Sequence, residues 1–205
     1  MRQMLLNLPV RTDYSAGAFA LTAGSAAARA AIEALVPSGK IHTGETVVVV
    51  GPPASGKSHL LTIWKTRMDG NQLAVAVDDL QALDKSQQEN LFHTYNTLKE
   101  KGGALLITST RPATELPLLP DLQSRLATAK HVILAPPDDT ELAQLIAEWA
   151  ADRQLVIPAG VVDYALARTE RSPAVLRALI EALDALSLEH KRAITVPLVR
   201  GLIER

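Results

Sequence analysis

Four consecutive valines run directly into a loop with two glycines, and this junction constrains the fold more than any other feature of the chain. The apolar stretch TVVVV occupies residues 46–50, and the loop GPPASGKS follows at residues 51–58. No polar residue alternates with the valines, so we expect a strand buried on both faces, as in a parallel sheet covered by helices. A helical pattern then runs from Ser58 to about Met68. The core therefore begins with a strand, a loop and a helix.

The loop fits the pattern G-x-x-x-x-G-K-[ST], in which backbone N–H groups turn inward around phosphate groups. The helix that follows directs the positive end of its dipole toward the same anion. In such a loop Lys57 reaches the terminal phosphates and Ser58 coordinates Mg²⁺. An ordinary Gly/Pro turn is the alternative, but the flanking strand and helix favour a phosphate-binding loop. The predicted nucleotide-binding residues here are Gly51, Pro52, Pro53, Ala54, Ser55, Gly56, Lys57, Ser58 and His59.

Three more apolar stretches predict strands, a second buried one at residues 72–79 and two more at 103–110 and 131–137, with helical patterns between them. The interval between Lys57 and Asp78 holds one helix, one turn and one strand, and leaves no room for another crossover. We therefore expect a small sheet of about four parallel strands.

After residue 137 the sequence changes to helical patterns at residues 138–153, 158–169, about 173–190 and 195–204. Strand–helix alternation followed by helices alone predicts an α/β core and an all-helical lid subdomain. The expected domains are an N-terminal arm at 1–17, the α/β core at 18–137 and the lid at 138–205.

Two aspartates, Asp78 and Asp79, end the second predicted strand. In phosphate-loop proteins an acid at this place holds the metal's hydration shell, and its neighbour orients an attacking water. We assign the metal role to Asp78 and the water-orienting, catalytic role to Asp79; a solvated strand end is the alternative. Thr110 follows the third strand, where hydroxyls reach the terminal phosphate, although Thr is also common in turns.

Arg125 precedes the fourth predicted strand, at the far edge of the core. An arginine there is placed to reach a nucleotide held by a neighbouring molecule, where it stabilises the charge that develops during phosphoryl transfer. The alternative is a solvated helix arginine.

The charge balance and the cysteine content exclude several classes of function. The chain has 21 Lys and Arg against 22 Asp and Glu and shows no basic segment, so nucleic acid is not the first partner to expect. It has no cysteine, which excludes disulfides and thiolate zinc sites and fits a reducing compartment. The apolar runs are too short to span a membrane, and the N-terminus does not resemble a signal peptide. We expect a cytoplasmic protein without a membrane partner.

Taken together, the motifs resemble the AAA+ domain of the bacterial replication initiator DnaA and its stand-alone regulatory homologues, the Hda family. The shared patterns are DDLQ at 78–81, FHTYN at 92–96, TSTRP at 108–112 and LQSRL at 122–126. The resemblance runs from residue 3 to about residue 203. It implies an AAA+ fold that binds ADP or ATP with Mg²⁺, and negative regulation of replication initiation through stimulated ATP hydrolysis by DnaA.

The N-terminal residues QMLLNL, at 3–8, are similar to the peptide by which this family docks on the sliding clamp, the β subunit of DNA polymerase III. Gln3, Leu6 and Leu8 match its anchor positions, and a Gln with two spaced leucines suits a shallow apolar groove. No helix-turn-helix follows the lid, so we expect no sequence-specific DNA binding. Self-association stays open.

The sequence also departs from the family pattern. The strand usual between the phosphate loop and the aspartates is missing, and Thr110 stands where the family often has Asp. The lid arginine that contacts nucleotide would fall at Ala174, which leaves Arg171 or Arg177 as substitutes one turn away. We include Arg177 among the predicted nucleotide-binding residues.

Two enzyme classes compete with a regulator. An autonomous AAA+ ATPase of helicase-loader type is the main alternative, because the phosphate loop and the aspartates are intact and permit weak ATPase activity. A small-molecule phosphate-loop kinase is less favoured, because Arg125 and the helical lid have no role in it.

Overall fold

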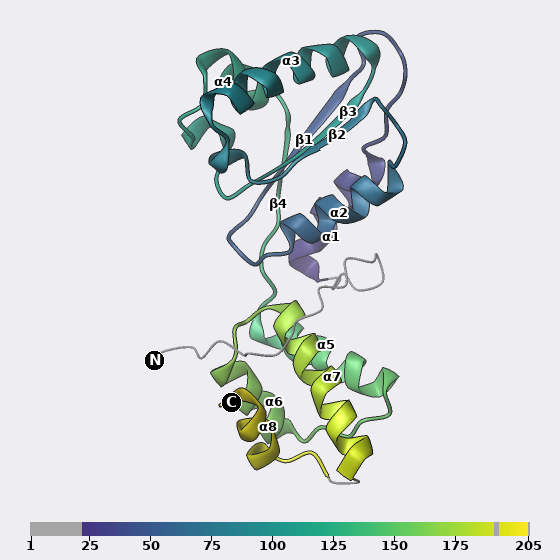
Figure 1. Ribbon diagram of the computed structural model, residues 1–205, viewed down its shortest axis with the longest axis vertical. Coiled ribbons are helices and arrows are strands. Elements are labelled where there is room, and N and C mark those ends of the chain that lie inside the picture. Colours follow the sequence, from purple (N-terminus) through teal and green to yellow (C-terminus); the bar gives the residue numbers. More distant parts are fainter. Residues whose placement is uncertain (1–21, 191–192, 205) are drawn as a thin grey trace. The chain divides into compact units, whose positions relative to one another are not determined.

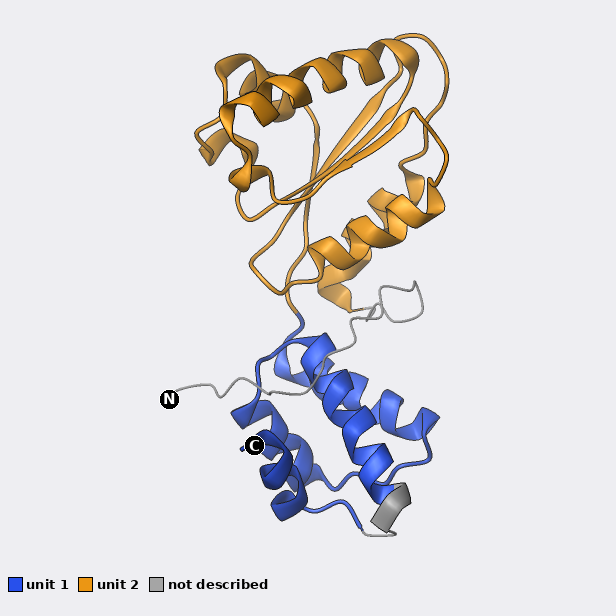
Figure 2. Ribbon diagram, in the orientation of Figure 1, with its two compact units in different colours: residues 1–13, 137–205 blue, residues 14–136 orange. Residues whose placement is uncertain are grey.

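The computed structural model describes residues 22–190 and 193–204. These residues belong to two compact units, and the boundary along the chain falls between residues 136 and 137 (Figures 1 and 2). The predicted arm at 1–17, with Gln3, Leu6 and Leu8, lies outside the described residues. In the part of the chain that is described, no helix is long and apolar enough to cross a membrane.

The first unit is built on a four-stranded parallel sheet with the order β2-β3-β1-β4. This confirms the predicted small parallel sheet, and the described residues between helix α2 and strand β2 contain no further strand. The strands are β1 (Glu45–Val50), β2 (Ala74–Val77), β3 (Ala104–Ser109) and β4 (Lys130–Ile133).

Helices cover both faces of the sheet (Figure 1). Helices α1 (Ala23–Ala34) and α2 (Lys57–Arg67) pack on one face, and α3 (Lys85–Lys101) and α4 (Pro120–Ala127) pack on the other. Two short 3-10 turns, η2 (Leu80–Ala82) and η3 (Ala113–Glu115), follow β2 and β3.

The valine run is explained by the position of β1 between β3 and β4. Val47 and Val49 pack against α1 and α2, whereas Val48 points into the cluster with α3 and α4, and each is at most 2% exposed. Successive side chains of a strand point to opposite faces, so a strand covered on both sides needs apolar residues at every position.

The outer strands are less buried than the sequence predicts. The second strand was expected to be buried, but β2 is an edge strand and all of its residues are only half-buried. β4 lies at the other edge, and Ile133 is 74% exposed. An edge strand has a neighbour on one side only, so apolar composition alone does not ensure its burial.

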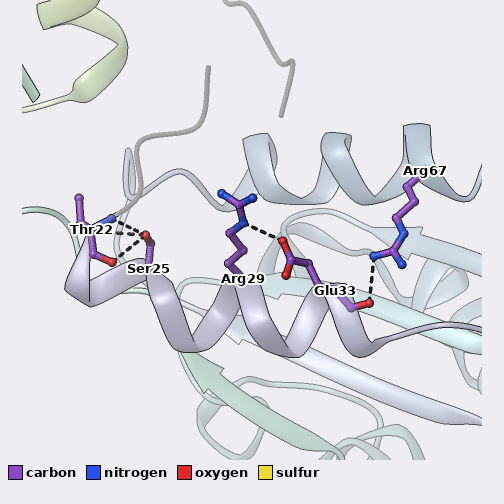
Figure 3. Close-up of polar contacts among 5 residues, drawn as sticks. All are labelled: Thr22, Ser25, Arg29, Glu33 and Arg67. Carbon is purple, nitrogen blue, oxygen red and sulfur yellow. Dashed lines mark hydrogen bonds and ion pairs between the residues drawn. The ribbon is translucent and has the colours of Figure 1, made fainter. Parts of the chain in front are cut away.

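Polar contacts join α1 to α2 (Figure 3). Arg67 Nη1 at the end of α2 donates to the Glu33 carbonyl oxygen at 2.9 Å, and Arg29 pairs with the Glu33 carboxylate at 2.8 Å. At the start of α1 the Thr22 amide donates to Ser25 Oγ at 2.9 Å. The Arg67 and Thr22 bonds satisfy backbone groups that helix ends leave unpaired, whereas the Arg29–Glu33 pair lies within α1.

Trp64 in α2 makes a buried hydrogen bond to Leu35, the residue that follows α1. Its side chain is 1% exposed, and its indole N–H donates to the Leu35 carbonyl oxygen at 2.8 Å. It is therefore a packing anchor, because its ring fills the core and its one polar atom is satisfied.

The second unit contains α5 (Asp139–Asp152), α6 (Ala159–Arg168), α7 (Pro173–His190) and α8 (Val196–Ile203), in agreement with the four predicted helical segments. Asp138 caps α5, accepting from the Glu141 amide at 2.8 Å while Glu141 accepts from the Asp138 amide at 3.0 Å. Helix α5 packs on α7, and α6 packs on α8.

We predict that Trp64→Phe lowers the free energy of unfolding by about 1–3 kcal/mol, because it leaves the buried Leu35 carbonyl without its donor. Urea denaturation measures this change. Thr66→Ala, on the exposed side of the same helix, is the control and should stay within about 0.5 kcal/mol of the wild type. Equal stability of the two variants would show that the indole hydrogen bond contributes nothing.

Candidate nucleotide-binding site

The loop between β1 and α2 has the backbone conformation that a phosphate cradle needs. Ala54 and Gly56 are in the left-handed region, at φ 60° and 94°. Such residues, placed among ordinary ones, turn neighbouring N–H groups toward one side and create an anion-binding concavity. Gly56 immediately precedes α2, whose first N–H groups have no acceptor within the helix.

Gly51 holds the start of this loop against the sheet. Its amide donates to the Ser109 carbonyl oxygen at 3.0 Å. A Cβ at this position would lie 2.4 Å from the Leu134 carbonyl oxygen and 2.8 Å from Ser55 Oγ, so no larger residue fits without displacing backbone. The first glycine of the motif is therefore required by close approach and not by a positive φ.

Lys57 begins α2 and folds back over the loop. Its ammonium donates to the Pro52 carbonyl oxygen at 2.7 Å, and the residue is only 6% exposed. Burial lowers the pKa of this ammonium, while the carboxylates of Asp79 and Asp78 act in the opposite direction. The lysine and the two aspartates that the sequence assigned to one site are thus close enough to interact electrostatically.

Ser55 supplies an independent test of whether the loop fits a phosphate group. Its hydroxyl is buried and has no hydrogen-bond partner among the described residues. A buried hydroxyl is normally paired, so this unsatisfied oxygen is a reason to expect a ligand. A loop with left-handed residues, a buried ammonium and a spare hydroxyl together fit a nucleotide phosphate, and Ser58 and Asp78 are the residues that would hold Mg²⁺.

Asp78 and Asp79 are oriented by the neighbouring strand. The Thr108 hydroxyl at the end of β3 donates to the Asp78 carboxylate and accepts from the Asp79 amide at 2.9 Å. Thr108 is fully buried, and Asp79 adopts a left-handed φ of 53°. The chain therefore turns sharply after β2, with both carboxylates at the carboxyl edge of the sheet, where open α/β sheets bind ligands.

Gln81 is a site residue that the sequence interpretation missed. Its amide nitrogen donates to Asp79 Oδ1 at 2.9 Å, and its amide oxygen accepts from the Thr110 amide at 3.0 Å. One side chain thereby joins Asp79, the water-orienting candidate, to Thr110, the residue predicted to reach the terminal phosphate. The pattern DDLQ contained this glutamine, but only the fold reveals its partner, because β2 and β3 pair across the sheet.

The arginines lie in different settings. Arg125 occupies the last turn of α4, is exposed, and makes no hydrogen bond or ion pair through its side chain within the described part of the chain. In the second unit, Arg177 Nε lies 3.5 Å from Glu181 and its guanidinium 5.9 Å from the Trp149 ring centre. Arg171 pairs with Asp139 at 3.2 Å.

Comparisons with known proteins agree with this arrangement. Residues 64–132 match the family model for the bacterial DnaA ATPase domain, and residues 138–203 match the model for the Hda lid domain. The chain is a DnaA-related AAA+ protein.

Solved structures share its fold at low sequence identity. Domain III of Thermotoga maritima DnaA is 18% identical with a TM-score of 0.71, and the match covers 96% of this chain and 98% of that one. AMPPCP-bound DnaA from Aquifex aeolicus is 20% identical with a TM-score of 0.69, covering 89% and 69%. A RuvB variant from Thermotoga maritima is 18% identical with a TM-score of 0.61, covering 88% and 67%.

The lowered pKa of Lys57 predicts an early loss of ADP affinity at alkaline pH. Phosphate attracts the protonated amine, and burial makes that form lose its proton below the usual lysine value of 10.5. Calorimetric affinity should therefore fall as the pH rises toward 10.5, whereas Lys57→Arg, which stays charged, should give a nearly flat profile. Parallel profiles for the two proteins would contradict the assignment.

Proposed function

We propose that this DnaA-related AAA+ protein is a nucleotide-bound regulator of replication initiation that docks on the sliding clamp and presents Arg125 to ATP-bound DnaA. The observation that carries the proposal is the contrast between the phosphate loop and the surroundings of Arg125. The phosphate loop is complete and internally braced, while Arg125 is exposed and without a side-chain partner among the described residues. An arginine free to reach another molecule suits a protein that completes its partner's active site.

Several observations support adenine nucleotide with Mg²⁺ as the ligand. The loop offers the left-handed residues Ala54 and Gly56, Lys57 and the unpaired Ser55 hydroxyl, and a similar DnaA structure is described as AMPPCP-bound. In this proposal Ser58 and Asp78 hold the metal. Asp79, fixed by Gln81, orients a water molecule, which permits slow intrinsic ATP hydrolysis.

Arg125 would act on the nucleotide of DnaA and not on the one bound here. A guanidinium brought to a transferring phosphoryl group stabilises developing charge, and such trans-acting arginines raise the rate by about 10³–10⁵. Converting DnaA-bound ATP to ADP would prevent renewed initiation. The match of residues 138–203 to the Hda lid model favours this regulatory role over that of an initiator.

In this proposal, the sliding clamp is the surface on which this protein encounters DnaA. Gln3, Leu6 and Leu8 lie outside the described residues, so the docking assignment rests on the sequence QMLLNL alone. The proposed setting is the cytoplasm, with DnaA and the clamp as partners.

An autonomous ATPase of helicase-loader type is the second candidate, and the intact Lys57, Ser58, Asp78 and Asp79 favour it. The isolated protein distinguishes the two functions, because a regulator that works in trans should turn over ATP far more slowly than about one per second.

We predict that Arg125→Ala abolishes clamp-dependent conversion of DnaA-bound ATP to ADP. The substitution removes an exposed side chain, so stability should stay within about 0.5 kcal/mol and ADP binding should not change. Arg125→Lys should restore little activity, because a point charge lacks the planar fork of the guanidinium. Thin-layer separation of labelled nucleotide follows the conversion.

Lys101→Ala, which removes another exposed cation of the same unit, is the matched control for Arg125→Ala. It should convert DnaA-bound ATP as the wild type does. Wild-type activity in Arg125→Ala would show that this arginine is an ordinary surface charge.

We also predict that Gln3→Ala weakens capture of this protein by immobilised clamp, because the peptide loses its polar anchor. Asn7→Ala, within the same segment but at an unanchored position, should be captured as well as the wild type. If both variants are captured like the wild type, the clamp contact lies elsewhere.

A further inference from the structure

Helix α4, which carries Arg125, packs on η3 and α3. It has eight residues, and its two fully buried side chains are Leu122 and Leu126. These leucines lie one turn apart on the same face, so they fix the distance between the helix and the core. A single apolar row along a helix constrains its rotation about its own axis only weakly.

Gln123 provides the missing constraint. The two hydrogens of its side-chain nitrogen are shared among three backbone carbonyls, those of Thr114 and Leu116 at 3.1 Å and of Ala113 at 3.3 Å. All three acceptors lie in and just after η3. One neutral side chain therefore ties α4 to the segment that follows β3.

The position of this tie on the helix matters for Arg125. With 3.6 residues per turn, Gln123 and Arg125 are about 200° apart around the helix axis. They flank the Leu122–Leu126 row on opposite sides, one facing the protein and the other facing solvent. Loss of the Gln123 bonds would let the helix roll, and a roll would redirect Arg125.

The η3 segment that Gln123 contacts is also connected to the candidate nucleotide-binding site. The η3 segment follows a turn in which the Ser109 hydroxyl donates to the Arg111 carbonyl oxygen at 2.6 Å and Gln81 accepts from the Thr110 amide. At the other end, the Leu119 amide before α4 donates to the buried Gln88 side chain at 2.9 Å. Gln88 thus holds the start of α4, and Gln123 holds its middle.

We propose that Gln123 is a positioning residue for Arg125: its bonds to η3 set the rotation of α4 and thereby the direction in which the arginine is presented. The inference rests on the proposed function of Arg125. Because the amide acts on geometry and not on partner contact, its loss should lower the maximal stimulated rate without changing the concentration needed for half-maximal stimulation.

The test compares Gln123→Met, which keeps the side-chain length but has no donor, with Ser124→Ala as the control on the same helix. In the DnaA assay with clamp, Gln123→Met should lower the maximal rate by about ten- to hundredfold, the effect of misplacing a reacting group by roughly 1 Å. The half-saturating concentration should stay within about twofold of the wild type. Should Gln123→Met unfold below the assay temperature, the isosteric Gln123→Glu, which also lacks the donor, replaces it.

A second measurement needs no activity. The chain contains no cysteine, so Lys65→Cys and Arg125→Cys introduce the only two spin-label sites. Pulsed electron spin resonance should show a shifted or broader distance distribution when Gln123→Met is added, and an unchanged one when Ser124→Ala is added.

An unchanged distribution in Gln123→Met would overturn the positioning role, as would a wild-type maximal rate in that variant. These results leave the proposed function intact if Arg125→Ala is still inactive. If the wild type itself fails to stimulate DnaA, the proposed function fails, and the spin-label distances still decide whether Gln123 orients α4.

Discussion

The close approach of Gly51 to the neighbouring strands is the constraint on which the candidate site depends. β1 lies between β3 and β4 with both faces covered, and the chain must leave the sheet at its carboxyl edge through a narrow gap. Only glycine fits there, because a Cβ would meet the Leu134 carbonyl oxygen at 2.4 Å. The Gly51 amide is fixed to Ser109 at the same point. The phosphate loop thus starts from a position set by the core, and this brings Lys57 within electrostatic range of the two aspartates.

Around this apolar frame, the carboxyl edge of the sheet is organised by neutral polar side chains. Thr108 orients Asp78 and the turn to Asp79, Gln81 joins Asp79 to Thr110, and Gln123 joins η3 to α4. Hydroxyls and amides hold geometry without adding charge, so the formal charges near the loop are those of Lys57 and the aspartates. A site built in this way can hold a highly charged ligand while its framework stays insensitive to protonation near neutral pH.

The sequence predicted the parts of the structure that local patterns encode. The valine run, the spacing of Gly51, Gly56 and Lys57, and the short interval to Asp78 gave the strand, the loop and the size of the sheet. The half-exposed β2 and the exposed Ile133 could not be foreseen, because edge positions follow from strand order and not from composition. The roles of Gln81 and Gln123 depend on partners about 29 and 7–10 positions away, and no spacing rule links those residues before the fold is known.

The central claim is that this protein promotes hydrolysis of a nucleotide held by another molecule. The most direct measurement loads DnaA with labelled ATP and this protein with unlabelled ADP, adds clamp on DNA, and follows the label in a single turnover. The account predicts that labelled ADP forms faster than with DnaA alone, and only when the clamp is present. It would be contradicted if the label stayed at the intrinsic DnaA rate while this protein hydrolysed its own ATP equally fast with or without DnaA.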